Sequence, residues 1–86
     1  MKRIFESYIE QHRFCEACGA WVSDRVMPHH IKTRGAGGRD IHENLIRLCS
    51  VCHIHIHAKG DRWFVEMFPH CYEKISAVKP NIGDRL

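Results

Sequence analysis

Two CxxC pairs constrain this chain more than any other feature of its sequence. Cys15 and Cys18 form the first pair, and Cys49 and Cys52 form the second. A CxxC turn directs two thiolates at one ion, and two such turns complete the closed tetrahedral shell of a structural zinc site. A redox-active CxxC or two unrelated pairs are the alternatives. Residues 19–48 separate the pairs, so a further structural unit must be built between them.

The small size of the chain gives such a metal site a role in folding. The chain has 86 residues, which predicts one domain spanning 1–86, and a domain of this size often needs a staple beside its limited core. Its five cysteines argue against a framework of disulfides alone, because the number is odd. No signal-peptide pattern and no apolar run of about 20 residues is present. We therefore expect a cytoplasmic protein without a membrane partner, in which paired cysteines bind metal.

Histidines form the second concentration of metal-binding side chains. His29 and His30 are adjacent, and three more histidines alternate at 53, 55 and 57, directly after the second CxxC pair. A strand would place these three on one face, whereas a helix places only His53 and His57 together, at i and i+4. We favour the helix, because a CxxC knuckle commonly leads into one. His53 and His57 could then bind one ion together with His29.

Apolar periodicity in the first half of the chain predicts one helix and short strands. Residues 3–13 carry apolar side chains at helical spacing. A hairpin is expected after the first CxxC pair, with strands at 21–22 and 26–31 and a turn at 23–25. Three glycines in 34–40 make that segment a loop.

The second half of the chain is predicted to be mainly helical. A short strand at 45–48 leads into a helix from Cys49 to Lys59, which Gly60 ends. Asp61 is expected to cap a helix at 62–68, and Pro69 to start another at 69–78. These segments predict a C-terminal helical extension at 61–79, followed by frayed residues at the chain end.

Taken together, the motifs resemble the zinc-containing branch of the HNH endonuclease family. The resemblance covers residues 15–57, in which both CxxC pairs are accompanied by four further motifs in the family's order: His29-His30-Ile31, Arg34-Gly35-x-Gly37-Gly38, Asn44-Leu45 and His53-x3-His57. It implies an α+β fold, a ββα-metal finger in which two antiparallel strands, a long loop and a helix surround a metal. We therefore expect an HNH core at 15–59, stapled by the four-cysteine zinc site and flanked by N- and C-terminal helices.

The resemblance also implies roles for individual side chains. His30 would be the general base, and Asn44 would brace the loop that orients it. His29 and His57 would bind the catalytic metal, and His53 matches a third ligand in members with the H-x3-H form.

Arginines supply the candidate contacts to DNA. Arg34, Arg39 and Arg47 lie in or beside the predicted loop and strand, and guanidinium groups suit phosphate oxygens. For each of them a solvated surface position is the alternative. Asp40 and Glu43 are too isolated in the sequence to form a paired-carboxylate two-metal site.

These parts predict a DNA endonuclease with one catalytic metal. The ion would bind the scissile phosphate and steady the leaving 3′ oxygen, while neutral His30 removes a proton from water. The cofactors would be a structural Zn²⁺ and a divalent ion such as Mg²⁺, Mn²⁺, Ni²⁺ or Zn²⁺. We expect DNA as partner, with weak sequence preference or a larger protein that supplies specificity, and by analogy a phage or bacterial origin.

Other zinc proteins fit the sequence less well. A non-catalytic zinc module that binds DNA or protein would need the cysteines but not the histidines and Asn44 together. The sequence lacks an H-x3-5-H pair at the distance after the first CxxC pair that a C2H2 finger requires. It also lacks the H-x-E and P-C-x-x-C signature of a zinc deaminase and the H-E-x-x-H motif of a zinc metallopeptidase.

Overall fold

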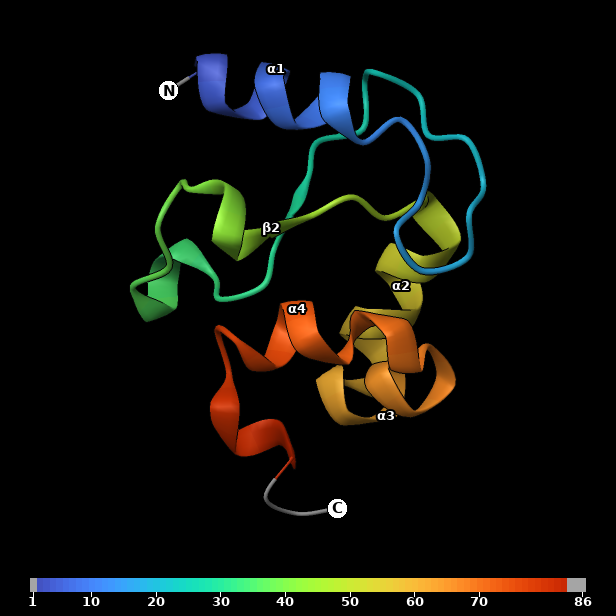
Figure 1. The fold of residues 1–86 in the computed structure, drawn as a ribbon, viewed down its shortest axis with the longest axis vertical. Coiled ribbons are helices and arrows are strands. Elements are labelled where there is room, and N and C mark those ends of the chain that lie inside the picture. Colours follow the sequence, from blue (N-terminus) through green and yellow to red (C-terminus); the bar gives the residue numbers. More distant parts are fainter. Residues whose placement is uncertain (1, 84–86) are drawn as a thin grey trace.

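The computed structural model describes residues 2–83, and these form a small α+β structure (Figure 1). The expected fraying of the chain end falls mainly on residues 84–86, which lie outside the described residues. The helices and strands of the described part are α1 Lys2–Gln11, β1 His29–His30, β2 Leu45–Ile46, α2 Ser50–Lys59, α3 Asp61–Met67 and α4 Tyr72–Ser76. Short 3-10 helices occupy Arg34–Ala36, His42–Asn44, Pro69–Cys71 and Pro80–Gly83. The predicted α+β class is therefore confirmed.

The sheet consists of β1 and β2, which pair antiparallel. His29 is opposite Ile46 and His30 is opposite Leu45 in the register. Leu45 and Ile46 are fully buried, so β2 fixes the position of the two histidines from within the core. The loop between the strands and the helix that follows β2 complete the expected ββα arrangement (Figure 1).

The predicted hairpin over 21–31 is wrong except at its end. Trp21 forms an isolated antiparallel bridge with Phe14 and does not pair with 26–27, and the strand begins only at His29. The cause is the first CxxC turn, which the chain closes tightly: Cys15 N–H donates to Ala20 O at 2.6 Å. Residues 21–22 are therefore used to close this turn rather than to form a sheet.

Helix α2 agrees with the sequence prediction at both ends. The Cys52 N–H points at Cys49 Sγ (3.5 Å), so a thiol occupies the N-cap position. Gly60 ends the helix with φ 91°, a conformation that glycine adopts without steric cost. The predicted cap by Asp61 is wrong, because Gly60 takes the N-cap position of α3 without a side-chain cap and Asp61 is the first helical residue.

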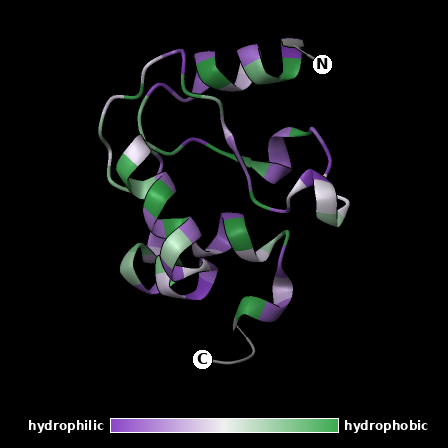
Figure 2. Ribbon diagram, turned by 180° about the vertical axis from the view of Figure 1, so that it is seen from behind, coloured by the Kyte–Doolittle hydropathy of each residue, from purple (hydrophilic) through white to green (hydrophobic). Residues whose placement is uncertain are grey.

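One apolar core joins the ββα unit to the C-terminal helices. Phe64 of α3 and Ile75 of α4 are fully buried and belong to the same cluster as Ile31 and Leu48. Apolar and polar residues alternate along α1 (Figure 2). Tyr8 of this helix is buried, and its hydroxyl donates a hydrogen bond to the Glu16 carboxylate. Within the described residues, the helices are too short or too polar to cross a lipid bilayer.

Candidate metal centres and catalytic cleft

The four cysteines of the CxxC pairs meet at one point. Their Sγ atoms all lie within 4.8 Å of one another, and Cys18 Sγ is 3.7 Å from Cys49 Sγ. Cys15 and Cys52 are 3% exposed, and Cys18 lies at the surface. Four soft ligands at such separations fit a tetrahedral zinc ion, and the shell leaves no position open for substrate.

Backbone N–H groups approach the sulfur atoms of two of these thiols, Cys15 and Cys49. Cys18 N–H approaches Cys15 Sγ at 3.4 Å, as Cys52 N–H approaches Cys49 Sγ. Burial raises the pKa of Cys15, but hydrogen bonds from the Cys18, Cys49 and Ala17 backbones outweigh this effect, and the pKa falls to about 7. Burial and the neighbouring thiols raise the pKa of Cys52. Four adjacent thiolates are unfavourable without a cation, and a zinc ion bound between them would supply the missing positive charge.

A second group of possible metal ligands consists of His29, His53 and His57. One ring nitrogen of each lies within 4.8 Å of the others, and the His53 and His57 Nε2 atoms are 3.0 Å apart. β1 supplies His29, while α2 supplies the other two, four residues apart on one helical face. The helix reading of residues 53–57 is thus confirmed, and His55 packs away from the group, against Trp63.

The electrostatics of this group suit a cation. Burial, together with the nearby His53 and His57, lowers the pKa of His29 to about 4. Burial and His57 also lower the pKa of His53. His29 is therefore neutral at neutral pH, the state in which an imidazole nitrogen binds metal.

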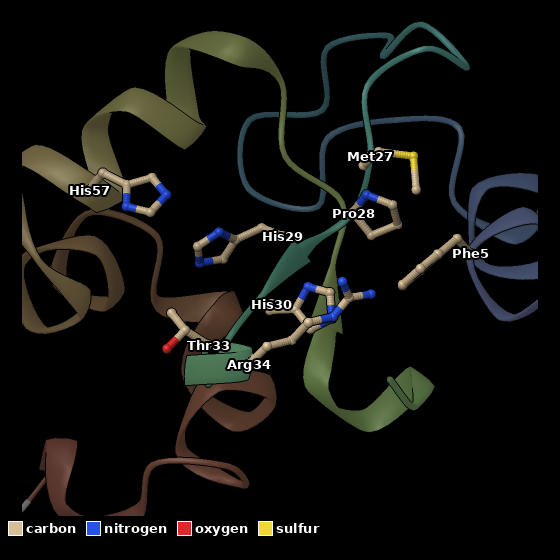
Figure 3. Close-up of a pocket in the computed structure, with 8 residues that line it drawn as sticks. All are labelled: Phe5, Met27, Pro28, His29, His30, Thr33, Arg34 and His57. Atoms are coloured by element: carbon tan, nitrogen blue, oxygen red, sulfur yellow. The ribbon is translucent and has the colours of Figure 1, made fainter. Parts of the chain in front are cut away.

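His29 and His30 extend to opposite sides of β1, because successive strand residues alternate. In Figure 3, His29 extends toward His57, whereas His30 extends toward Arg34. All four side chains line one open cleft of about 440 Å³, whose remaining wall is largely apolar and formed by Phe5, Met27, Pro28 and Thr33. Two members of the three-histidine group (His29, His53 and His57), namely His29 and His57, therefore share this cleft with His30.

His30 has a carboxylate partner that the sequence did not reveal. Its Nε2 lies 2.7 Å from Asp40 Oδ1. Arg34 binds the same carboxylate through Nε and Nη2, at 3.0 and 3.1 Å, and its guanidinium lies over the Phe5 ring. Hydrogen bonds from Arg34 and then His30 hold the pKa of Asp40 below its usual value, so the carboxylate is ionised. The sequence argues only against a paired-carboxylate site at Asp40, whereas the glycine loop folds this residue back onto β1, where it contacts His30 and Arg34.

Asn44 fastens this loop. Its Oδ1 accepts from Lys32 N–H at 2.8 Å, and its Nδ2 donates to Lys32 O and Arg39 O, both at 2.9 Å. The side chain is buried, so all three bonds are shielded from water. Gly38 allows the close approach, because a Cβ there would lie 1.7 Å from Lys32 O.

The three expected phosphate contacts differ in their surroundings. Arg39 is exposed, and Arg34 is exposed but bound to Asp40. Arg47 is fully buried, and its guanidinium donates to the carbonyls of residues 12, 23 and 26 at 2.6–3.3 Å. This corrects the expectation that Arg47 contacts DNA: its side chain ties together the segments around the first CxxC turn.

Comparison with known proteins agrees with this geometry. A family model described as HNH endonuclease matches residues 15–59, which is more than half of the chain. The chain therefore belongs to the HNH endonuclease family, and its four clustered cysteines fit the zinc-containing branch. No curated protein and no solved structure is significantly similar to it.

Proposed function

We propose that the protein is a metal-dependent endonuclease that hydrolyses DNA phosphodiester bonds, with His30 as general base. The observation that supports this most strongly is the shared cleft: His29 and His57, two members of the three-histidine group, line one cleft together with His30, which is bonded to Asp40. His29, His53 and His57 would hold the divalent ion, which would act as a Lewis acid on the phosphodiester. A structural Zn²⁺ would occupy the four-cysteine site.

The proton chemistry follows from the bond to Asp40. The ionised carboxylate accepts a hydrogen bond from Nε2–H of His30, which leaves Nδ1 without a proton and able to accept one. Nδ1 would take a proton from the attacking water, whose oxygen would bond to phosphorus as the P–O3′ bond breaks. The leaving 3′ oxygen would take a proton from solvent water, so that the products carry 5′-phosphate and 3′-hydroxyl ends. Asn44 would contribute indirectly, by holding the loop that carries Asp40.

Substrate selection would be weak in the isolated chain. We expect electrostatic contacts to phosphates, from residues such as Arg39, and either little sequence preference or a larger partner protein that supplies specificity. We also expect a cytoplasmic location, since the paired cysteines are suited to metal rather than to disulfides.

Single-turnover cleavage of supercoiled plasmid tests the proposal. Wild-type protein should nick or linearise DNA only when Mg²⁺, Mn²⁺ or Ni²⁺ is added. His30→Ala should lose about 10²–10⁴-fold in rate, the usual contribution of a general base, while zinc content and DNA affinity stay unchanged. His55→Ala is the matched control, because His55 lies outside the three-histidine group.

Two outcomes would count against the proposal. Equal rates for wild type and His30→Ala would remove the general-base role. A folded, zinc-loaded protein that binds DNA without metal-dependent cleavage would instead be a non-catalytic nucleic-acid-binding module.

A further inference from the structure

The C-terminal extension contributes side chains to the metal side of the molecule. A small cleft of about 170 Å³ is lined by His29 and His57 of the three-histidine group and also by Asp61 and Lys79. The same Asp61 and Lys79 line a second, larger cleft of about 610 Å³, which we call the extension cleft. The two clefts therefore adjoin at Asp61 and Lys79, so a chain-like ligand at the histidines would lie next to Lys79.

Cations predominate in the extension cleft. Lys32 and Lys79 line it together with Arg62 and the carboxylate of Asp61. Asp61 Oδ2 accepts from Lys79 Nζ at 2.5 Å, and the lysine side chain is still 39% exposed. An ammonium group has three donors, so Lys79 can keep the bond to Asp61 and also bind an oxygen of a ligand.

The charges of Asp61 and Lys79 lie close to the three-histidine group, because both residues line the small cleft together with His29 and His57. An anion bound at the histidines would therefore interact with Lys79 as well.

Two of the three arginines that were expected to bind phosphate make other contacts. Arg47 is buried, and Arg34 is bound to the carboxylate of Asp40. Lys79 lies beyond residues 15–59, the part that the family model matches, so its position belongs to this chain's own extension.

We propose that Lys79 and Lys32 form a subsite in the extension cleft for a DNA backbone phosphate next to the scissile one. The proposal rests on the proposed function, because it takes the scissile phosphate to lie at the three-histidine group. Lysine binds phosphate as a point charge, and each phosphate neutralised by a protein cation releases counterions from DNA. Asp61 positions Lys79 in this arrangement.

The salt dependence of DNA binding tests the subsite. His30→Ala protein, which should not cleave, is titrated into a fluorescent duplex at several NaCl concentrations. Adding Lys79→Met should reduce the slope of log K against log salt by about 0.9, the value for one phosphate contact on B-DNA. Lys32→Met should also reduce the slope, by no more than this amount because both lysines bind the same phosphate, and it leaves the Asp61–Lys79 pair intact. Lys79→Arg should keep the slope of the background.

Two controls separate a local contact from other effects. Arg25→Met removes the same charge from an exposed position that lines neither cleft, and should change the slope little. Asp61→Asn removes the carboxylate that Lys79→Met would leave unpaired, so comparing Asp61→Asn with Asp61→Asn/Lys79→Met should still show the loss of about 0.9.

The outcomes distinguish this subsite from the nuclease proposal. Unchanged slopes in Lys79→Met and Lys32→Met, or an equal loss in Arg25→Met, would overturn the subsite alone. If the lysine variants show the expected slope changes but wild type shows no metal-dependent cleavage, the nuclease proposal alone would be overturned. Absence of DNA binding by the His30→Ala background would overturn both.

Discussion

The Nε2 atom of His30 lies 2.7 Å from the Oδ1 atom of Asp40, and Arg34 forms an ion pair with the same carboxylate. A carboxylate bonded to one imidazole nitrogen fixes the tautomer and leaves the other nitrogen as acceptor. We therefore expect Asp40 to be a positioning residue that acts through His30.

Asp40→Ala should lower the single-turnover cleavage rate by about 10–100-fold, the usual cost of losing such a supporting partner. DNA affinity and zinc content should not change. If Asp40 acts through His30, the substitution should have no further effect in a His30→Ala background, because the base is already absent. An additional loss in the double mutant would show a separate role for Asp40.

Zinc removal should unfold the protein. Chelation, or Cys15→Ser or Cys52→Ser, should abolish the folded circular dichroism spectrum, since metal binding is part of folding in domains of this kind. Elemental analysis of the native protein should give one tightly bound zinc per chain. A folded sample with almost no zinc would contradict the prediction.

Cys71 should behave differently from the other four cysteines. It is buried, its Sγ lies 3.6 Å from Glu16 O, and burial raises its pKa to about 11. Because only the thiolate reacts, a raised pKa slows alkylation at pH 8. Cys71→Ser should retain zinc, and iodoacetamide should label native wild type slowly at every cysteine until chelator is added. Rapid labelling of Cys71 in zinc-loaded protein would argue against its burial.

The three-histidine group should bind a second, weaker divalent ion. Imidazole ligands favour Mn²⁺, Co²⁺, Ni²⁺ or Zn²⁺ over Mg²⁺. In calorimetry on zinc-loaded protein, His29→Ala/His57→Ala should lose most of this affinity, whereas His55→Ala should keep it. Unchanged affinity in the double mutant would place the ion elsewhere.

Arg47→Met should destabilise the fold rather than weaken DNA binding directly. The guanidinium bonds to three backbone carbonyls, and each buried carbonyl left unpaired costs about 1–3 kcal/mol. A loss of roughly 3 kcal/mol or more in denaturant unfolding is expected. Arg39→Met is the exposed control and should unfold at the wild-type midpoint. If Arg47→Met kept full stability but lost DNA affinity, the side chain would reach DNA after all.

The sequence predicted those features that depend on residues close together in the chain. A CxxC turn brings two thiols together within four residues, and the 3.6-residue period of α2 places His53 and His57 on one face. Gly60 ends α2 for an equally local reason, since only its own φ is involved. The resemblance of these motifs to the HNH family, confirmed by the family match over residues 15–59, then supplied the ββα order.

Tertiary structure decided the contacts between distant segments. Asp40 meets His30 only because Asn44 and Gly38 close the loop between them, and Arg47 is buried only because three separate segments converge on it. Lys79 reaches the histidine side of the molecule through the packing of the C-terminal helices on the shared core. Loop closure and packing depend on the balance of chain entropy against burial over the whole domain, and no short sequence pattern records that balance.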